Sequence, residues 1–552
     1  MTVVPPTTSA KTLADLFTTA VATFGPRPAL DFMGRKTSYA ELGRQVGAVT
    51  AGLQALGVVH GTRVAMTMPN CPATVILYFA IQRAGGIVVA LNPLYVEREI
   101  SHLLRDSGAE IVCLPNLSDI STKVVKATEG SAVRHIVACD FAAQLPAIKR
   151  ILFRIARRAA IAHDLVGPRF VSFQTLLATK GKPVPVATAP DDPAALQYTG
   201  GTTGLPKAAV LTQANLLANF AQVVDTVAAM PGAYRTAICV LPLFHVFAMM
   251  AILISTIGQG GEIVLVPRFE AKDLIKTIAR TKPTAMFGVP TIYTAILREP
   301  GLNPADLASI MTCVSGGAPL PAEIRTEFER VTGVAVREGY GLSETSPVVT
   351  MTPLDGGREG SCGRIVANTR IAIRDIEPPH ADLAIGERGV VWINGPQVMR
   401  GYWNRPEETA KALVDGWFNT GDVGYLDEDG FLYLIDRTKD LILCSGYNVY
   451  PRVIEEALYA HPAVLEAVVI GVPDSHRGQA PKAFVVLRPG QVATVADLRA
   501  HLAEHVSKIE MPREIEFRES LPKTLIGKLS KKELVEEEAA KRAAAEGSRS
   551  AA

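Results

Sequence analysis

Short apolar runs that suit β-strands alternate with helical patterns along much of this 552-residue chain, and this alternation constrains the fold most strongly. In one stretch, strand and helix patterns follow one another at 63–68, 73–84, 87–91, 97–107 and 111–114. The same rhythm returns at 236–242, 262–267, 271–281, 285–289 and 310–315. Strands that alternate with helices predict an α/β fold of parallel-rich sheets, with helices covering both faces.

The pattern changes near Gly386 to short strands punctuated by glycine, such as 389–394 and 430–435, which predicts a β-rich subdomain. Helix and strand patterns then alternate over 453–517, as is typical of a small α+β domain. We therefore expect an N-terminal domain at 1–435 and a C-terminal domain at 436–552. The Ala- and charge-rich end, 536–552, lacks helix caps and is predicted to be disordered.

Charge and cysteine content exclude several classes of function. The formal net charge is only +2, from 56 basic and 54 acidic residues, so we expect no nucleic-acid partner. The seven cysteines lie far apart and form no CxxC pair, which argues against a disulfide framework and against a zinc site. The first residues lack a basic segment followed by an apolar core, so no secretory signal is expected. These features predict a cytoplasmic protein.

The most apolar stretch runs from Val240 to Ile257, with Pro242 near its start and Gly258 directly after it. It is marginal in length for a bilayer span. A proline at the entrance and glycines at the exit are typical of a buried helix, which we expect here instead of a membrane crossing.

The segment 148–159 has the pattern of a basic amphipathic helix. Apolar residues recur there at helical spacing, at Ile148, Ile151, Leu152, Ile155 and Ala159. Cations occupy the positions between and after them, at Lys149, Arg150, Arg154, Arg157 and Arg158. Such a helix can bind an anionic lipid surface peripherally, or it can pack its apolar stripe on the protein.

A loop rich in glycine and threonine, YTGGTTGLPK at 198–207, suits a polyphosphate. Its glycines (Gly200, Gly201 and Gly204) allow the backbone amides to approach an anion closely. The hydroxyls of Thr199, Thr202 and Thr203 and the charge of Lys207 add further donors. The spacing differs from that of a Walker loop, and an ordinary β-turn is the alternative. The apolar run 194–198 predicts a strand that leads into this loop.

Other short motifs carry groups that could act on a nucleotide. The segment 338–345 combines Tyr340, whose ring could stack on a purine, with Glu344, an oxygen ligand of the kind that Mg²⁺ prefers. Asp422 follows a glycine and could accept from ribose hydroxyls, although Gly-Asp pairs also form plain turns. His245 in its apolar run could equally be a core histidine, and Lys528 after Gly527 could equally be a solvated cation.

Five motifs follow one another in order: the Gly/Thr loop, YGLSET at 340–345, TGD at 420–422, IDRTKD at 435–440 with GYNVYP at 446–451, and PKTLIGK at 522–528. In this order they resemble the adenylate-forming superfamily of acyl-CoA synthetases, over nearly the whole chain. Within it, LPLFHVFA at 241–248 and GPQVMRGYW at 395–403 are most similar to bacterial long-chain fatty-acid CoA ligases.

This resemblance implies a two-step reaction with ATP, Mg²⁺ and CoA. A medium- or long-chain fatty acid first forms an acyl adenylate and releases pyrophosphate, and CoA then displaces AMP. The alternatives are an acyl-AMP ligase that loads a carrier protein, and a CoA ligase for aryl or short-chain acids. A non-catalytic lipid-binding scaffold is a further alternative. A homodimer and contact with the inner face of the membrane are also expected.

The resemblance also implies site residues. Lys528, His245 and Glu344 would be catalytic, with Thr202 and Glu344 at the metal. The nucleotide and CoA would contact Thr199, Gly200, Gly201, Thr202, Thr203, Gly204, Lys207, Gly317, Ala318, Pro319, Glu338, Gly339, Tyr340, Thr345, Asp422, Arg437, Ser445, Gly446 and Tyr447. An apolar tunnel near Phe247, Phe287, Val289 and Ile292 would hold the acyl tail.

The resemblance further implies that the C-terminal domain is a mobile lid hinged at Asp436. Its rotation would exchange Lys528 for the strand around Ser445, Gly446 and Tyr447. The chain departs from the family pattern at Val453, where a glutamate is usual, whereas Glu455 is retained. Because this position belongs to the lid helix, we expect altered lid contacts and intact chemistry.

Overall fold

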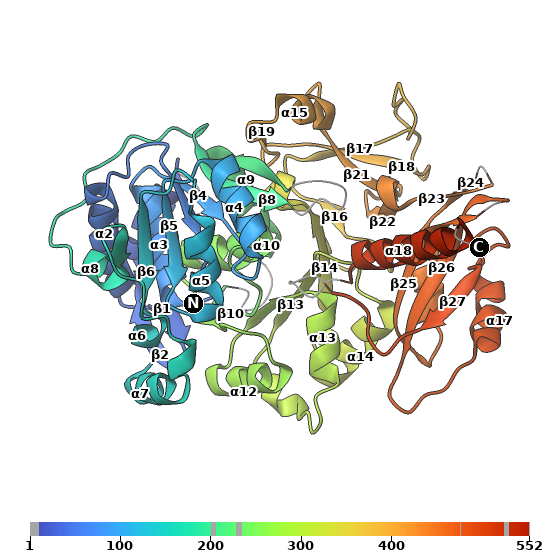
Figure 1. Cartoon of the computed structure of the whole chain (residues 1–552), viewed down its shortest axis with the longest axis horizontal. Helices are drawn as coiled ribbons and strands as arrows, with labels where there is room; N and C mark the ends of the chain where they lie inside the picture. Colours follow the sequence, from blue (N-terminus) through green and yellow to red (C-terminus); the bar gives the residue numbers. More distant parts are fainter. Residues whose placement is uncertain are drawn as a thin grey trace.

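The computed structural model describes residues 10–199, 206–227, 234–445, 447–474, 476–523 and 529–550, with the backbone alone for 543–550. Four β-sheets organise this part of the chain. The two large sheets and a small third sheet lie in the N-terminal region, and the fourth belongs to the C-terminal region at the opposite end of the long axis (Figure 1).

The first large sheet has nine strands, and its central pairings are parallel. Antiparallel strands complete both edges, β2 at one and β15 and β16 at the other. Its order is β16 (Arg364–Ile365), β15 (Val348–Met351), β14 (Val336–Gly341), β13 (Thr312–Gly316), β12 (Ala285–Gly288), β10 (Thr236–Cys239), β11 (Glu262–Leu265), β1 (Pro28–Phe32) and β2 (Arg35–Ser38).

The second large sheet has eight strands and is parallel from β8 to β7. Strands β9 and β19 extend it in the antiparallel sense. Its order is β19 (Gly401–Tyr402), β9 (Lys207–Thr212), β8 (Pro193–Thr199), β4 (Ile87–Ala90), β3 (Arg63–Met66), β5 (Ile111–Pro115), β6 (His135–Cys139) and β7 (Phe170–Ser172). The predicted parallel-rich α/β fold is confirmed.

Helices cover both faces of this second sheet. On β3, Val64 belongs to one apolar cluster and the next residue, Ala65, belongs to another. Since successive side chains of a strand point to opposite faces, both faces are buried. Helix α3 (Pro72–Arg83) contributes to the first cluster, and α4 (Glu97–Ser107) contributes Ile100, Leu103 and Leu104 to the second. The predicted helices at 73–84 and 97–107 are therefore present.

The apolar stretch 240–257 is buried, as predicted, but its helix begins only at Val246. It consists of a short α-turn (α10, Val246–Ala248), a π-helical segment (Met249–Ile254) and a final α-turn (α11, Ser255–Gly258). Across the described ranges, no helix has both the length and the apolar character that crossing a bilayer would require.

The small third sheet begins earlier than the sequence predicted, at Arg370 instead of near Gly386. Strands β18 and β21 form its centre, and β22 brings the chain to Arg437. Its strands are β17 (Arg370–Arg374), β18 (Gly389–Asn394), β21 (Trp417–Leu426), β20 (Leu413–Val414) and β22 (Leu432–Arg437).

The C-terminal sheet packs around two apolar clusters of its own. Helices α16 (Pro451–Tyr459) and α17 (Val495–His505) contribute to the first cluster. The strands are β24 (Tyr447–Val449), β23 (Ile442–Cys444), β26 (Gly478–Leu487), β25 (Val464–Asp474) and β27 (Glu514–Phe517).

The end of the chain differs from the expected disorder, because α18 spans Lys531–Ser550. Its first half is held by ion pairs to the C-terminal sheet, where Glu538 contacts Lys482 at 3.0 Å and Glu537 contacts Arg518 at 2.6 Å. Lys482 is only 4% exposed. The charges that suggested a solvated tail therefore form tertiary contacts.

Candidate active site

The predicted adenine-site residues lie where β13 and β14 end. These strands are parallel, with Gly316 opposite Gly339, so the loops that follow them meet at one edge of the sheet. Gly317 has φ +80°, a conformation that other residues rarely adopt, and it starts the loop that continues through Ala318 and Pro319. In open α/β sheets, ligands bind at the carboxyl ends of the strands.

Tyr340, Asp422 and Arg437 come together at this edge, from strands β14, β21 and β22. The Tyr340 hydroxyl donates a hydrogen bond to Asp422 Oδ2 at 2.6 Å. Arg437 Nε pairs with Asp422 Oδ1 at 2.8 Å. Burial and the neighbouring Asp422 carboxylate raise the pKa of Tyr340, so its hydroxyl stays a donor. Asp422 is thus a buried carboxylate whose position is fixed from two sides.

Glu338 forms a hydrogen bond with the loop that follows β13. Its Oε2 accepts a hydrogen bond from the Leu320 amide at 3.3 Å, and Arg325 Nη1 lies 3.8 Å from its Oε1. Burial raises the pKa of this carboxyl, while the Leu320 amide and Arg325 oppose that rise. The contacts of Glu338 therefore hold the adjacent loop in place.

Glu344 is buried and is oriented by a tyrosine distant in sequence. The Tyr402 hydroxyl donates to Glu344 Oε1 at 2.9 Å. Burial raises the pKa of Glu344, and the Tyr402 hydrogen bond partly opposes this. The Lys207 ammonium lies 5.3 Å from the centre of the Tyr402 ring. The structure thus connects Lys207, at the end of the Gly/Thr motif, to the YGLSET motif through Tyr402.

Thr345 is fully buried, and its hydroxyl forms hydrogen bonds within the turn that contains it. It donates to the Pro347 carbonyl at 2.6 Å and accepts from the Leu342 amide at 3.0 Å. The predicted α-phosphate contact would therefore require this hydroxyl to change partners.

The Gly/Thr motif connects two antiparallel strands, as the predicted lead-in strand suggested. Thr199 ends β8, Lys207 begins β9, and the two residues are opposite each other in the register. The Thr199 hydroxyl donates to the Lys207 carbonyl at 3.3 Å. The residues from Gly200 to Leu205, which include the predicted Gly200, Gly201, Thr202, Thr203 and Gly204, lie outside the described ranges.

His245 lies beside the same sheet edge. It lines a small cavity of about 10 Å³ with Phe247, Val289 and Gly317 among its walls. A Cβ on Gly316 would come within 3.3 Å of the Phe247 ring, so this glycine allows the helix after His245 to pack against β13. The structure therefore joins the predicted acyl and adenine residues at one place.

Two buried amides hold the turn before His245, and sequence reasoning missed both. Gln197 Nε2 donates to the Phe244 carbonyl at 3.0 Å, and Asn70 Oδ1 accepts from the Leu243 amide at 2.9 Å. Gln197 directly precedes the Gly/Thr motif. The signal that marks these two amides is that they are polar and yet buried, and burial can be seen only in the folded structure.

The predicted acyl tunnel is closed in this conformation. Phe287, Val289 and Ile292 are each at most 5% exposed. A cavity of about 10 Å³ holds roughly one water molecule, so an acyl tail would need these side chains to move.

The predicted residues of the C-terminal domain are only partly described. Lys528 and Gly446 lie outside the described ranges. Ser445, with φ +53°, and the exposed Tyr447 flank the β23–β24 turn. Figure 1 places β24 at the outer side of the C-terminal sheet, away from the ends of β13 and β14. This conformation does not bring Ser445 and Tyr447 to the other site residues.

Asp436 connects β22 to the C-terminal domain. Its Oδ2 accepts from the Arg452 amide at 2.9 Å, at the start of α16. The Arg452 guanidinium donates to the Leu434 carbonyl at 2.9 Å. Next to the unusual Val453, Glu455 Oε1 accepts from the Val469 amide and pairs with Lys531 at 3.1 Å.

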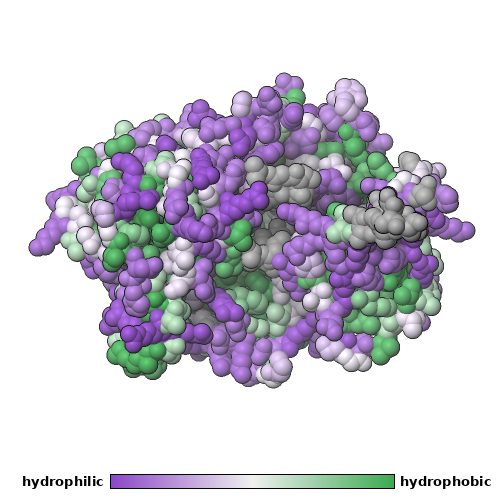
Figure 2. Space-filling model, in the orientation of Figure 1, coloured by the Kyte–Doolittle hydropathy of each residue, from purple (hydrophilic) through white to green (hydrophobic). Residues whose placement is uncertain are grey.

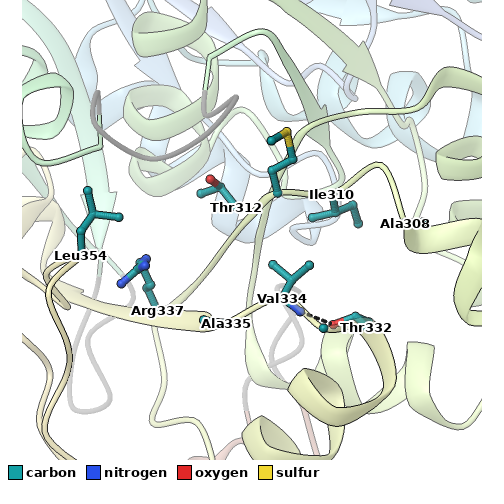
Figure 3. Close-up of a pocket in the computed structure, with 10 residues that line it drawn as sticks. Ala308, Ile310, Thr312, Thr332, Val334, Ala335, Arg337 and Leu354 are labelled. Carbon is teal, nitrogen blue, oxygen red and sulfur yellow. Dashed lines mark hydrogen bonds between the residues drawn. The ribbon is translucent and has the colours of Figure 1, made fainter.

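A larger hollow, with a volume of about 430 Å³, lies elsewhere (Figure 3). It is lined by Thr312 and Arg337, at the beginnings of β13 and β14, and by Leu354. Arg337 Nη1 donates to the Pro353 carbonyl at 2.6 Å. This hollow is therefore at the opposite edge of the sheet from the predicted site residues.

Comparison with known proteins identifies the family. The family described as AMP-binding enzyme matches residues 17–403, and the AMP-binding enzyme C-terminal domain matches residues 453–528. The chain belongs to the AMP-binding enzyme family. The first match covers well over half of the chain, and it contains the ends of β8, β13 and β14 that carry the candidate site.

Relatives of this AMP-binding enzyme extend over nearly its full length. It is 41% identical over 534 residues to a long-chain-fatty-acid–CoA ligase of Bacillus subtilis, covering 96% of this chain and 95% of that protein. The solved structure of ATP-bound MatB from Rhodopseudomonas palustris has a TM-score of 0.81 and 30% identity, covering 94% and 98% of the two chains.

A further solved structure is the anthranilate CoA ligase AuaEII in complex with anthranoyl-AMP. It matches the AMP-binding enzyme with a TM-score of 0.84 and 27% identity, covering 97% and 98% of the two chains. The predicted adenylate-forming fold is thus confirmed over both regions of the chain.

Proposed function

We propose that this AMP-binding enzyme joins a medium- or long-chain fatty acid to CoA through an acyl adenylate, releasing AMP and pyrophosphate. The observation that carries the proposal is the junction at the ends of β13 and β14. The edge that carries the buried polar cluster around Asp422 also carries Gly317, which lines an apolar cavity together with His245. The near-full-length similarity to a long-chain-fatty-acid–CoA ligase supports the same substrate class.

The nucleotide would lie across the sheet edge. Gly317, Ala318, Pro319, Gly339 and Tyr340 would surround the adenine, since their loops meet at this point. Asp422 and Arg437, already paired at 2.8 Å, would hold the ribose hydroxyls. The phosphates would contact the Gly/Thr motif from Thr199 to Lys207, and Thr345 would reach the α-phosphate after its hydroxyl exchanges partners.

Glu344 fits a Mg²⁺ ion that is held mainly by phosphate oxygens. It is a buried carboxylate whose Oε1 is oriented by Tyr402, and an adjacent cation would offset the cost of its burial. Within the described ranges, no group of three or more His, Cys, Asp or Glu residues forms a metal cage. Mg²⁺ commonly binds through one or two carboxylates plus phosphates, and Thr202 would complete the site. The ion would neutralise charge on the leaving pyrophosphate.

The fatty carboxylate would lie between His245 and the nucleotide. Its oxygen attacks the α-phosphorus, and the bond from this phosphorus to the pyrophosphate oxygen breaks. His245 would orient the carboxylate, because Gln197, as a donor, and Asn70, as an acceptor, fix the turn on which it lies. The acyl tail would displace the side chains around Phe247, Phe287, Val289 and Ile292, and each buried methylene would contribute about 0.8 kcal/mol.

The C-terminal domain would serve the two steps in two orientations. Lys528 would bridge the carboxylate and the phosphate during adenylation. A rotation at Asp436, between domains at 1–435 and 436–552, would then bring Ser445, Gly446 and Tyr447 to the CoA path. The thiol sulfur attacks the acyl carbon, and AMP leaves with the bonding electron pair. Support for this hinge position is the hydrogen bond that Asp436 Oδ2, on β22, accepts from the Arg452 amide at the start of α16.

We also propose that the enzyme contacts the inner face of the membrane peripherally. The contact would be made by the basic residues Lys149, Arg150, Arg154, Arg157 and Arg158. We also include a homodimer, which sedimentation of the purified protein would test. The absence of acidic residues from 147–160 supports the membrane contact.

Product analysis tests the proposed reaction. The purified enzyme is incubated with ATP, Mg²⁺, CoA and palmitate, and the products are separated by chromatography. Palmitoyl-CoA and AMP are expected. Accumulation of palmitoyl-AMP without thioester would favour a carrier-protein acceptor instead. A series from acetate to palmitate, with benzoate included, tests the alternative of an aryl or short-chain acid CoA ligase, since a higher kcat/KM for benzoate or acetate would contradict the fatty-acid assignment.

A further inference from the structure

Helix α7 (Ala147–Ala156) exposes an apolar stripe to solvent, and none of its residues is buried. The stripe is formed by Ile148, Ile151, Leu152 and Ile155, whose exposed fractions are 75%, 58%, 58% and 73%. These side chains lie at helical spacing and therefore share one face. Figure 2 shows the resulting apolar cluster at the lower left, where Figure 1 places α7. The alternative in which this apolar stripe packs against the protein itself is therefore wrong.

The helix is nevertheless firmly attached through its other face. The Phe153 ring packs 5.5 Å from the Phe141 ring, and Arg154 Nη2 pairs with Asp140 Oδ2 at 2.7 Å. Lys149 Nζ donates to the Met33 carbonyl at 2.9 Å. These contacts fix the orientation of α7 and keep the four apolar side chains directed outward.

The cations around the stripe divide into two groups. Lys149 and Arg154 contact the protein, as described above. Arg150, Arg157 and Arg158 form no ion pair with any described residue, and no acidic residue occurs from 147 to 160. Arg35 adds a further exposed cation beside the helix, because its Nη1 donates to the Ala143 carbonyl just before α7. The stripe therefore lies in a surface that is positively charged at its edges.

We infer that α7 is an interfacial helix that inserts Ile148, Ile151, Leu152 and Ile155 into an anionic lipid surface. Exposed isoleucine and leucine beside unpaired arginines match the two layers of such a surface, acyl chains below and anionic headgroups above. A stripe for a second protein copy would require acidic groups opposite these arginines, and α7 itself offers none. This inference rests on the proposed membrane contact and refines it. The four apolar side chains insert into the lipid, and Arg154, which pairs with Asp140, does not bind the headgroups.

The position of α7 has a consequence for the reaction cycle. It lies at the N-terminal end of the long axis, whereas α18 and β27 lie at the opposite end (Figure 1). A membrane bound at α7 would therefore contact the N-terminal domain and leave the C-terminal domain free to rotate.

Vesicle flotation tests this inference with two variants. The first, I148S/I155S, removes apolar area and keeps every charge. The second, R150Q/R157Q/R158Q, removes the unpaired cations and keeps the stripe. Wild-type protein should float with vesicles of phosphatidylglycerol and phosphatidylcholine in equal parts, and far less with phosphatidylcholine alone. The charge variant should lose about a hundredfold in partitioning, at about fivefold for each cation. The apolar variant should lose a similar factor.

Matched controls use residues remote from α7. Ile385→Ser changes another exposed isoleucine, 66% exposed, and K508Q/R513Q/K532Q removes three exposed cations near α18 and β27, at the opposite end of the long axis. Both controls should float like wild type, and unchanged thermal unfolding midpoints would show that all variants are folded. Wild-type flotation that is absent, or unaffected by I148S/I155S, would overturn the inference. Conversion of a wild-type dimer to a monomer by I148S/I155S, without loss of flotation, would assign the stripe to a second copy.

Discussion

The Tyr402 hydroxyl donates a hydrogen bond to Glu344 Oε1 at 2.9 Å, although the two residues are 58 positions apart in the sequence. The contact stabilises the ionised form of a carboxyl whose pKa is raised by burial. Because a metal ligand must be ionised, we expect activity to fall as the pH drops through the pKa of Glu344 in the free enzyme.

Tyr402→Phe should therefore move the acidic limb of the pH profile of kcat/KM to higher pH. Removing the hydroxyl deletes an interaction that lowers the Glu344 pKa, so the carboxylate is lost earlier on acidification. Tyr433→Phe is the control, since this hydroxyl also faces a carboxylate, Asp427 Oδ2 at 3.3 Å, but outside the site. An acidic limb that shifts to lower pH, or does not shift, would contradict the assignment of Glu344.

Asp422→Asn should weaken nucleotide use specifically. The change removes the negative charge that pairs with Arg437 and replaces one of the two acceptor oxygens offered to the ribose hydroxyls by an NH₂ donor. We expect kcat/KM for ATP to fall by about a hundredfold, the scale of two hydrogen bonds to a charged group. The control is Asp427→Asn, which removes a carboxylate that pairs with Arg358 at 2.7 Å on the surface. Equal losses for both variants would mean that Asp422 acts only through stability.

Gln197→Leu should slow the chemical step by releasing the turn before His245. Loss of the 3.0 Å hydrogen bond to the Phe244 carbonyl should lower kcat by about tenfold, with little change in KM for ATP. In a His245→Ala background the same change should cost nothing further, because the two residues act together. Gln82→Leu is matched, since Gln82 is also buried and donates to the Ala194 carbonyl at 2.9 Å. Additive losses would refute the coupling.

Lys528→Ala should separate the two half-reactions. Pyrophosphate release should fall by about a thousandfold, whereas conversion of supplied palmitoyl adenylate and CoA to thioester should persist. Lys523→Ala removes a lysine that pairs with Glu466 at 2.6 Å and should affect neither step strongly. Equal loss of both half-reactions in Lys528→Ala would exclude the two-orientation scheme.

Local sequence patterns predicted much of the fold, because strand and helix periodicity and the order of the motifs are properties of neighbouring residues. The parallel pairing of β12 with β13 follows from that alternation. Strand β14, which brings Tyr340 to the same edge as Gly317, lies outside the predicted strands. The strand that leads into the Gly/Thr motif was found in the same way.

Contacts between distant residues could not be predicted. Gln197 belongs to none of the recognised motifs. Its hydrogen bond to the Phe244 carbonyl forms only because the fold brings β8 next to the turn before His245. The helical end of the chain was missed for a similar reason, since Glu538 and Glu537 find Lys482 and Arg518 on other elements. For α7, the sequence pattern predicted an apolar stripe, but only the packing of Phe153 on Phe141 shows which face of the helix points to solvent.

Fatty-acid-dependent pyrophosphate release by the purified enzyme tests the central claim most directly. With ATP, Mg²⁺ and palmitate but without CoA, the account predicts about one pyrophosphate for each active site, followed by steady turnover once CoA is added. If no tested fatty acid produces pyrophosphate above the rate with ATP and Mg²⁺ alone, the proposed activation of an aliphatic acid at the ends of β13 and β14 is contradicted.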